Sequence, residues 1–307
     1  MFQPPLEGLI AATITPLRED GEVDAVAIAP MIDRLIATGV TGLYVCGSTG
    51  EGMSLTCEER KQVVEETVKA SGGRVPVIVQ VGHNSLADAT ALAAHAEACG
   101  ADVISATCPS YFKVDDTSNL VRCMQSLAAG APNLPFYYYH IPALTGSQID
   151  VAEFLRSGRQ AIPSLAGLKY TNTLLHEFQH CCRVEEGQLD VVWGCDEMLL
   201  AAFATGAKAA IGSTYNIAAP LYQRVIEAIA GNRWDQARDL QYRSVALVNV
   251  MKVYSFHSAL KAIMEMLGMS AGPCRAPIRN LTPTQTDSLR KGLESIEFFD
   301  WCGHQIS

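Results

Sequence analysis

Two apolar runs, Pro135-Phe-Tyr-Tyr-Tyr139 and Leu165-Ala-Gly-Leu-Lys169, have a helical segment between them. Short runs rich in aromatic and aliphatic residues are typical of buried strands. Asp150 followed by Glu153 is a helix-start signal, since the first side chain caps free N–H groups and the second places an acid in the first turn. Two strands joined by a helix pair in parallel, so this unit predicts a strand–helix–strand fold.

The same alternation runs along most of the chain. Eight apolar runs are candidate strands: residues 8–14, 42–46, 76–81, 103–106, 135–139, 165–169, 189–193 and 207–211. Eight parallel strand–helix units without an evident interruption favour closure into a barrel over an open sheet. The sequence therefore predicts an α/β fold, a (β/α)8 TIM barrel.

The segments between these runs carry helix signals. One of them has a single apolar face, with spacing typical of a helix, formed by Ile28, Met31, Ile32, Leu35 and Ile36. Thr56 with Glu59, and Ser85 with Asp88, repeat the start signal seen at Asp150.

The strand signals cease after about residue 216. Helical stretches follow at about 219–230, 234–252 and 258–267, with a fourth after Thr282. We interpret the first as the eighth barrel helix and the others as a C-terminal helical extension. Because no polar linker separates the two parts, we predict a barrel over residues 1–230 and an extension over 231–307 that form one structural unit.

The composition and net charge limit the partners and the cellular location that we expect for the protein. The chain has 307 residues, of which 49% are hydrophobic and 18% charged, and its formal charge is -9. A net negative charge repels nucleic acid and anionic membranes, so we expect neither as a partner. The N-terminus lacks a signal-peptide pattern, and no apolar run approaches about 18 residues, so we expect a cytoplasmic protein.

Ten cysteines do not indicate a disulfide scaffold in a chain of this length. Cys46, Cys99, Cys108 and Cys195 lie in or beside apolar stretches, which is typical of reduced thiols. No C-x-x-C pair occurs, so the sequence predicts no sulfur-ligated metal site.

Lys169 is the first candidate for chemistry, because active sites of such barrels lie at the C-terminal ends of the strands. Pointing inward among apolar residues, its amine would have a lowered pKa and would be a nucleophile able to form a Schiff base with a ketone. The alternative is a lysine that extends from a strand end to solvent. Lys208 precedes the end of its run and is expected near the opposite, stabilising end of the barrel.

Three further rim segments carry polar side chains. Residues 137–140 (Tyr-Tyr-Tyr-His) offer a phenol as a proton relay, although tyrosine is also an ordinary strand residue. Residues 47–52 (Gly-Ser-Thr-Gly-Glu-Gly) predict a nest of N–H groups and hydroxyls for a carboxylate or phosphate, or else a simple tight turn. Residues 194–197 and 212–216 add carboxylates and hydroxyls suited to a polyol, although Asp196 and Glu197 equally suit a helix cap.

One motif points to a different chemistry. His176-Glu-Phe-Gln-His180 matches H-E-x-x-H, which on a helix offers two zinc ligands and a general base. The extended metalloprotease pattern requires Gly and His where this chain has Arg183 and Glu186. We interpret the match as chance on a helix outside the barrel.

Four blocks, in their order and spacing, resemble the N-acetylneuraminate lyase family: residues 47–51, 137–146, 167–170 (Gly-Leu-Lys-Tyr) and 212–216 (Gly-Ser-Thr-Tyr-Asn). That family is a branch of the pyruvate-dependent class I aldolases, which include dihydrodipicolinate synthase. The resemblance runs from about residue 6 to the C-terminal helices. It implies a reversible cleavage of N-acetylneuraminate to pyruvate and N-acetylmannosamine in sialic acid degradation, by a homotetramer that uses neither cofactor nor metal.

The resemblance also implies roles for single residues. Lys169 would form the Schiff base and Tyr139 would relay protons. Ser48 and Thr49 would hold the substrate carboxylate, and Tyr111 would reach across a subunit contact. The sugar-binding groove would be lined by Thr171, Gly194, Asp196, Glu197 and Ser213.

Two alternatives stay open. In dihydrodipicolinate synthase, the turn that corresponds to residues 142–146 carries an arginine, and here it reads Pro-Ala-Leu-Thr-Gly, which favours the lyase without excluding another 2-keto acid aldolase. The fold alone also permits a non-catalytic keto acid sensor. A lysine nucleophile and a proton relay in one pocket favour an enzyme over a sensor.

Overall fold

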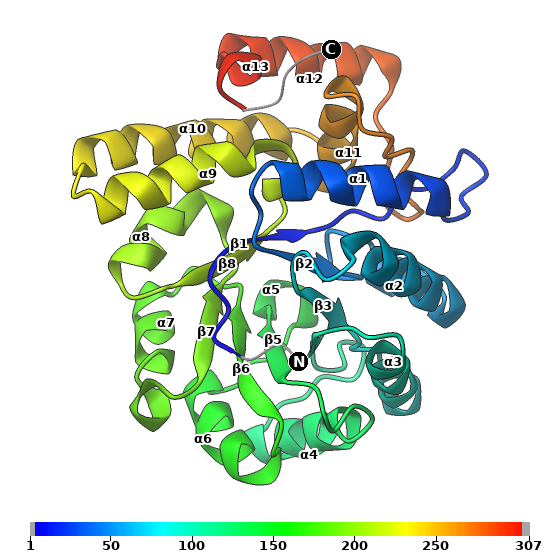
Figure 1. Ribbon diagram of the computed structural model, residues 1–307, viewed down its shortest axis with the longest axis vertical. Coiled ribbons are helices and arrows are strands. Elements are labelled where there is room, and N and C mark those ends of the chain that lie inside the picture. The colour runs from blue at the N-terminus through cyan, green and yellow to red at the C-terminus, as the bar shows by residue number, and fades with distance from the viewer. Residues whose placement is uncertain (1–3, 303–307) are drawn as a thin grey trace.

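The computed structural model describes residues 4–302, and its centre is a closed barrel of eight parallel strands in sequence order (Figure 1). The strands are β1 (Gly8–Ala12), β2 (Gly42–Val45), β3 (Val77–Gln80), β4 (Val103–Ala106), β5 (Phe136–His140), β6 (Leu165–Tyr170), β7 (Asp190–Trp193) and β8 (Ala209–Gly212). Their ends lie within two residues of the eight predicted runs. The predicted TIM barrel is confirmed.

Helices surround the barrel and continue beyond it. They are α1 (Ala25–Ala37), α2 (Cys57–Ser71), α3 (Leu86–Ala98), α4 (Thr117–Ala128), α5 (Pro142–Thr145), α6 (Val151–Ala161), α7 (Leu175–Cys181), α8 (Leu199–Ala204), α9 (Tyr215–Ala230), α10 (Trp234–Lys252), α11 (Phe256–Met266), α12 (Pro283–Ser295) and α13 (Phe298–Trp301). The sequence predicted the long helices, and it did not predict the single turns α5 and α13, which are too short to show periodicity.

The predicted start signals act as caps. Thr56 and Glu59 form a capping box at α2, in which the Thr56 hydroxyl accepts from the Glu59 N–H and the Glu59 carboxylate accepts from the Thr56 N–H. Ser85 and Asp150 accept from backbone N–H groups at the starts of α3 and α6. Each cap fixes the residue at which a loop ends, so it also fixes the length of the loop that carries site residues.

The core has two layers, because neighbouring strand residues face opposite sides. Tyr137 and Tyr139 belong to the cluster inside the barrel, whereas Tyr138 belongs to the outer layer and contacts Phe154 of α6, with ring centroids 4.6 Å apart. The strand period therefore selects which tyrosine of the predicted trio can reach the inside of the barrel near its C-terminal end.

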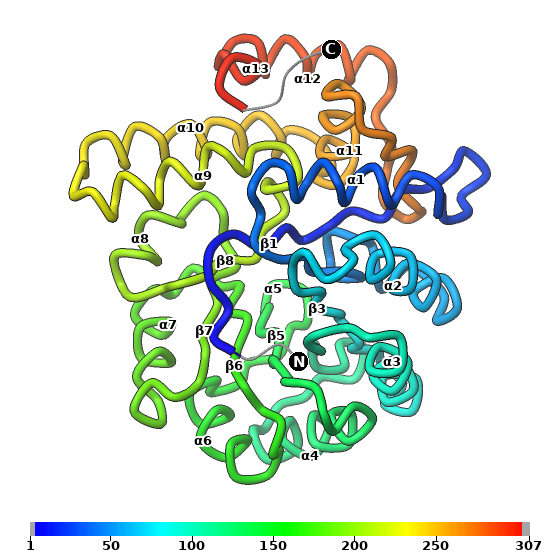
Figure 2. Tube along the Cα trace, viewed as in Figure 1, coloured from blue at the N-terminus to red at the C-terminus, as the bar shows by residue number. Residues whose placement is uncertain are grey.

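The C-terminal helices pack on one side of the barrel, where α10 lies against α9 and α12 lies against α10 and α11. Figure 2 shows this part of the chain, in yellow to red, beside α1 in blue. α9 ends at Ala230 and α10 begins at Trp234, whereas the division into parts 1–230 and 231–307 stays a prediction, and residues 1–3 and 303–307 lie outside the described residues. Within residues 4–302, no helix combines the length and the apolar character needed to cross a membrane.

The cysteines named above are thiols in the structure. Cys46 is buried, and burial raises the pKa of its thiol to about 11 although Arg60 nearby acts in the opposite direction. The raised pKa keeps the Cys46 thiol protonated at neutral pH, and a protonated thiol is unreactive because the thiolate is the nucleophile.

Candidate active site

Lys169 lies inside the barrel near the end of β6. It pairs in register with Tyr139 of β5, which places both side chains on the inner face of neighbouring strands. Its Nζ lies 3.8 Å from the centroid of the Tyr44 ring and 4.0 Å from that of Tyr139, and the residue is 3% exposed. The alternative of a lysine extending to solvent is therefore excluded by the structure.

Burial sets the protonation of this amine. It lowers the pKa of Lys169 to about 7, against the opposing attraction of the Asp196 carboxylate. At pH 7 about half of the amine is neutral, whereas at its usual pKa roughly one part in three thousand would be. A neutral amine is the nucleophilic form, so the site can support covalent chemistry with a carbonyl group.

Tyr139 supplies a phenol next to that amine. Burial raises its pKa to about 12, and the hydroxyls of Ser48 and Thr171 beside it act in the opposite direction. The phenol therefore rests protonated at neutral pH and donates a proton before it accepts one. Ser48 comes from the loop after β2 and Thr171 from the end of β6, so three separate segments meet at the Tyr139 hydroxyl.

The turn after β2 is the predicted anion nest. Cys46 and Glu51 have φ values of 57° and 55°, in the left-handed region that few non-glycine residues adopt. Residue 52 is a glycine because a Cβ at this position would lie 1.9 Å from the Cys46 carbonyl oxygen. Thr49 and Ser213, predicted in two different rim segments, share a hydrogen bond of 2.7 Å between their hydroxyls. The loops after β2 and β8 thus meet at one point of the rim.

The predicted sugar-binding residues lie along the loops after β6, β7 and β8. Gly194 has to be a glycine, since a Cβ would lie 2.0 Å from the Thr171 Oγ1. Glu197 is half-buried, and its carboxylate lies 3.8 Å from the Lys252 Nζ of α10. Glu197, one of the predicted sugar-binding residues, therefore lies beside α10.

Asp196 is held by the loop after β8. Its Oδ2 accepts from the backbone N–H of Thr214 at 2.8 Å and from the Thr214 hydroxyl at 2.6 Å. It does not cap α8, whose start at Met198 has no side-chain cap, so that alternative was wrong for Asp196. Burial raises the pKa of Asp196 to about 6, which leaves it ionised at neutral pH.

Tyr111 lies on the loop after β4, far more exposed than the other candidates. It is 78% exposed and packs edge-on against Phe112, which is 83% exposed. Asn84 fixes this loop, because its Oδ1 accepts from the backbone N–H groups of Ser110 and Tyr111. The role of Tyr111 at a subunit contact stays a prediction.

Two groups of residues whose side chains could ligate a metal form contacts within the protein instead. In the H-E-x-x-H segment, Glu177 accepts from the Tyr170 hydroxyl at 2.5 Å, and the His180 Nε2 lies 3.2 Å from Arg156. Within the described part of the chain, possible ligand atoms of Cys57, His83 and Asp88 also come together. The Nδ1 of His83 already accepts the Ser85 N–H, so one of its two ring nitrogens serves the start of α3.

Several site residues escaped the sequence analysis. The ring of Tyr44, on β2, packs against the Lys169 amine, and the alternation of inward and outward residues along this strand could have pointed to it. Thr214 holds Asp196, and it was quoted only as part of its segment. His257 and Lys261 of α11 also contact the nest. His257 lies 209 positions after Ser48, and no local sequence pattern predicts a contact between segments so far apart.

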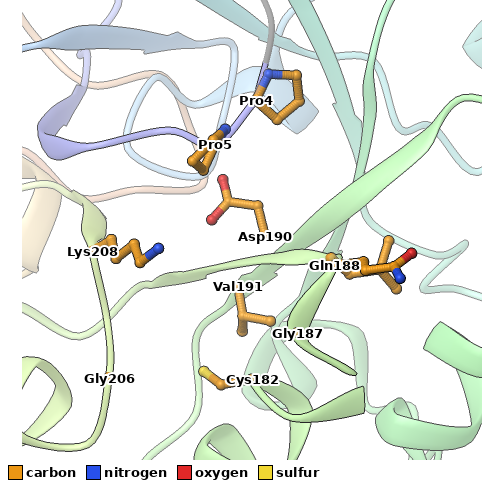
Figure 3. A pocket seen from close by; sticks show the side chains of 10 residues that line it. Pro4, Pro5, Cys182, Gly187, Gln188, Asp190, Val191, Gly206 and Lys208 are labelled. Atoms are coloured by element: carbon orange, nitrogen blue, oxygen red, sulfur yellow. The ribbon is translucent and has the colours of Figure 1, made fainter. Parts of the chain in front are cut away.

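The other end of the barrel also has a hollow, of about 340 Å³ (Figure 3). Asp190 and Lys208 line it together with Pro4 and Pro5, as Figure 3 shows. Lys208 is thus at the N-terminal end of the strands, as predicted from its place in the eighth run.

The chain is thus a (β/α)8-barrel protein with a buried lysine amine beside a tyrosine phenol near the C-terminal ends of its strands. The chain belongs to the Dihydrodipicolinate synthetase family, whose model matches residues 5–296. The N-acetylneuraminate lyase of Rattus norvegicus is 38% identical over 303 residues, covering 97% of this chain and 95% of the relative. The predicted family is confirmed.

Solved structures give the same result. The N-acetylneuraminate lyase of Proteus mirabilis superposes with a TM-score of 0.93 at 40% identity, covering 95% of this chain and 99% of that one. The N-acetylneuraminate lyase (sialic acid aldolase) of Aliivibrio salmonicida superposes with a TM-score of 0.94 at 36% identity, covering 96% and 98%. The likeness therefore extends over nearly the whole of both chains.

Proposed function

We propose that this chain is an N-acetylneuraminate lyase, which cleaves N-acetylneuraminate reversibly to pyruvate and N-acetylmannosamine through a Schiff base on Lys169. The observation that carries the proposal is the buried amine with a pKa of about 7 beside the Tyr139 phenol. Relatives with this name match along nearly their whole length. No metal or organic cofactor is required, because the lysine itself supplies the electron sink.

The first half of the reaction forms the iminium. The neutral amine of Lys169 attacks the C2 ketone of the open-chain sugar acid, and Tyr139 donates its proton to the departing hydroxyl, which leaves as water. The nest at Ser48 and Thr49 holds the substrate carboxylate and so keeps the ketone against the amine. The positive iminium then draws electrons from the neighbouring bond.

The second half breaks the carbon–carbon bond. The Tyr139 phenolate takes the proton of the C4 hydroxyl, the C3–C4 electron pair moves into the enamine, and N-acetylmannosamine leaves as the aldehyde. Protonation of the enamine carbon and attack of water on the iminium release pyruvate and restore the amine. Thr171, Gly194, Asp196, Glu197 and Ser213 bind the hydroxyl-bearing end of the sugar. We further propose a cytoplasmic homotetramer in which Tyr111 lies at a subunit contact.

The test traps the covalent intermediate. Pyruvate and borohydride are added to the protein, and peptide mapping by mass spectrometry locates the reduced adduct. We expect the adduct on Lys169, and folded protein without an adduct would overturn the lysine chemistry. The acceptor is tested separately, since a higher kcat/KM with aspartate semialdehyde than with N-acetylmannosamine would reassign the enzyme to the synthase branch.

A further inference from the structure

The C-terminal extension contacts the anion nest from its outer side. The Nε2 of His257, in α11, lies 2.8 Å from the carbonyl oxygen of Ser48. A carbonyl oxygen only accepts, so this nitrogen carries a hydrogen and donates it. The bond joins residues 209 positions apart, at the one turn that is proposed to hold the substrate carboxylate.

A second contact holds the other end of the same turn. The Glu51 carboxylate forms an ion pair of 2.7 Å with Lys261, and their side chains are 0% and 3% exposed. The other carboxylate oxygen accepts the backbone N–H of Arg275 at 2.7 Å, and Lys261 also donates to the Pro273 carbonyl at 2.7 Å. Both contacts come from residues 257–275, which lie in the predicted extension.

The guanidinium of Arg275 contacts the start of the next helix, α2. It lies 2.7 Å and 2.6 Å from the two carboxylate oxygens of Glu59, the acid of the α2 capping box. It also donates to the Ser54 carbonyl at 3.0 Å. The segment from the nest to the first turn of α2 is therefore held at three points by the C-terminal extension.

Peptide geometry makes the His257 contact directional. The Ser48 carbonyl and the Thr49 N–H belong to one planar peptide group, in which the two bonds point in opposite directions. A donor that fixes the carbonyl toward α11 therefore fixes the Thr49 N–H away from α11. The left-handed Glu51 is a sparsely populated conformation, and such residues persist where the surrounding contacts over-determine them.

We propose that His257 is a positioning residue for the carboxylate nest, acting through the Ser48–Thr49 peptide, and that the Glu51–Lys261 pair holds the remainder of the turn. The proposal rests on the proposed function, since it takes the nest as the carboxylate site. The C-terminal extension is then part of the substrate site, although none of its residues touches the reacting atoms.

The test measures carboxylate binding through Lys169. Borohydride trapping is titrated with pyruvate and, in parallel, with hydroxyacetone, a ketone without a carboxylate. His257→Leu removes the donor, and we expect the half-saturating pyruvate concentration to rise roughly three- to tenfold, the range for one lost hydrogen bond. The hydroxyacetone titration and the maximal trapping are expected to stay unchanged. In catalysis the same variant should raise KM more than it lowers kcat.

Matched variants separate positioning from a loss of stability. His257→Gln places an amide N–H at the same distance along the side chain, so we expect it to restore pyruvate binding. Gln285→Ala removes the second half of the α12 capping box, in the same extension but away from the nest, and should lower the melting temperature without changing pyruvate binding.

Three results would overturn the inference. Unchanged pyruvate binding in His257→Leu would do so, as would an equal weakening of pyruvate and hydroxyacetone trapping. Absence of a pyruvate adduct on Lys169 in the unmodified protein would overturn the proposed function and the inference together. The unmodified protein thus tests the chemistry, and the His257 variants test the positioning.

Discussion

The two ends of the barrel hold similar residues in different states. Near the C-terminal ends of the strands, Lys169 and Tyr139 lie together, with Asp196 close by. At the N-terminal ends, Tyr137 of the same strand donates to Asp190 at 2.8 Å, and Lys208 lines the adjoining hollow (Figure 3). Each end therefore has a lysine, a tyrosine and an aspartate.

Their partners explain the difference. At the N-terminal end, the Asp190 Oδ2 accepts hydrogen bonds from the Tyr137 hydroxyl and from the backbone N–H of Leu6, so these polar atoms are hydrogen-bonded to one another. Near the C-terminal end, the Lys169 amine faces two aromatic rings, and its pKa falls to about 7 because burial outweighs the attraction of Asp196. An amine buried among aromatic rings is partly neutral at pH 7, whereas Tyr137 and Asp190 stabilise the fold through their hydrogen bond.

The largest expected effect is the loss of Lys169. Lys169→Met removes the nucleophile, so we expect kcat to fall by more than about 10⁴-fold, a larger loss than a missing proton relay causes. Lys208→Met is the matched control at the other end of the barrel, and its kcat should stay within about twofold, since active sites lie at the C-terminal end. Steady-state assay and borohydride trapping measure both. Comparable losses in the two variants would refute the division between the ends.

Tyr139→Phe comes next. Removing a positioned acid–base group typically costs about 10² to 10⁴ in rate, so kcat should fall by that amount. The phenyl ring keeps its contact with the Lys169 amine, and the trapped lysine adduct should still form slowly with pyruvate. A rate within tenfold of the original would remove Tyr139 from the proton relay.

The pH dependence of trapping is the third prediction. With a pKa of about 7, the neutral fraction of Lys169 rises roughly tenfold between pH 6 and pH 8, and the initial rate of adduct formation should follow. If the rate instead kept rising steeply above pH 9, the amine would have its ordinary pKa.

The same shift has a consequence for stability. The pKa of Lys169 is lower in the folded protein than the usual 10.5, so between those values the unfolded chain binds more protons and stability rises with pH. Relative to Lys169→Met, the free energy of unfolding should increase by about 2 kcal/mol from pH 7 to pH 9. Chemical denaturation of both proteins at the two pH values measures this difference. A flat difference would show that the amine is not buried.

Sequence patterns predicted the barrel and its rim, because these depend on local periodicity. The eight strands follow from short apolar runs, and Lys169 follows from its place at a strand end, whereas only the resemblance to the family selected Tyr139 from the three tyrosines. The pairing of Tyr139 with Lys169 depends on the register of β5 and β6, which no local pattern encodes. The resemblance to the family supplied the roles of single residues.

Contacts between distant segments could not be predicted in this way. Thr214 holds Asp196 across the gap between β7 and β8, and His257 reaches Ser48 from α11. Each contact joins two segments that come together only when the barrel closes and the C-terminal helices pack against it. The alternative in which Asp196 caps the following helix was wrong for the same reason, because a cap signal is local and the donor to Asp196, Thr214, lies 18 residues further along the chain.

The smallest expected effect on activity tests the N-terminal end. Tyr137→Phe removes one of the two donors to the Oδ2 of the half-buried Asp190, and the loss of one such hydrogen bond typically costs about 0.5–1.5 kcal/mol of stability. Burial already raises the pKa of Asp190, and losing the phenol should raise it further, so this carboxylate would become protonated more readily. We therefore expect a lower melting temperature with kcat and KM nearly unchanged, measured by thermal unfolding and steady-state assay. A tenfold loss of kcat in a folded Tyr137→Phe protein would show instead that the two ends of β5 act together, and that the N-terminal end contributes to catalysis as well as to stability.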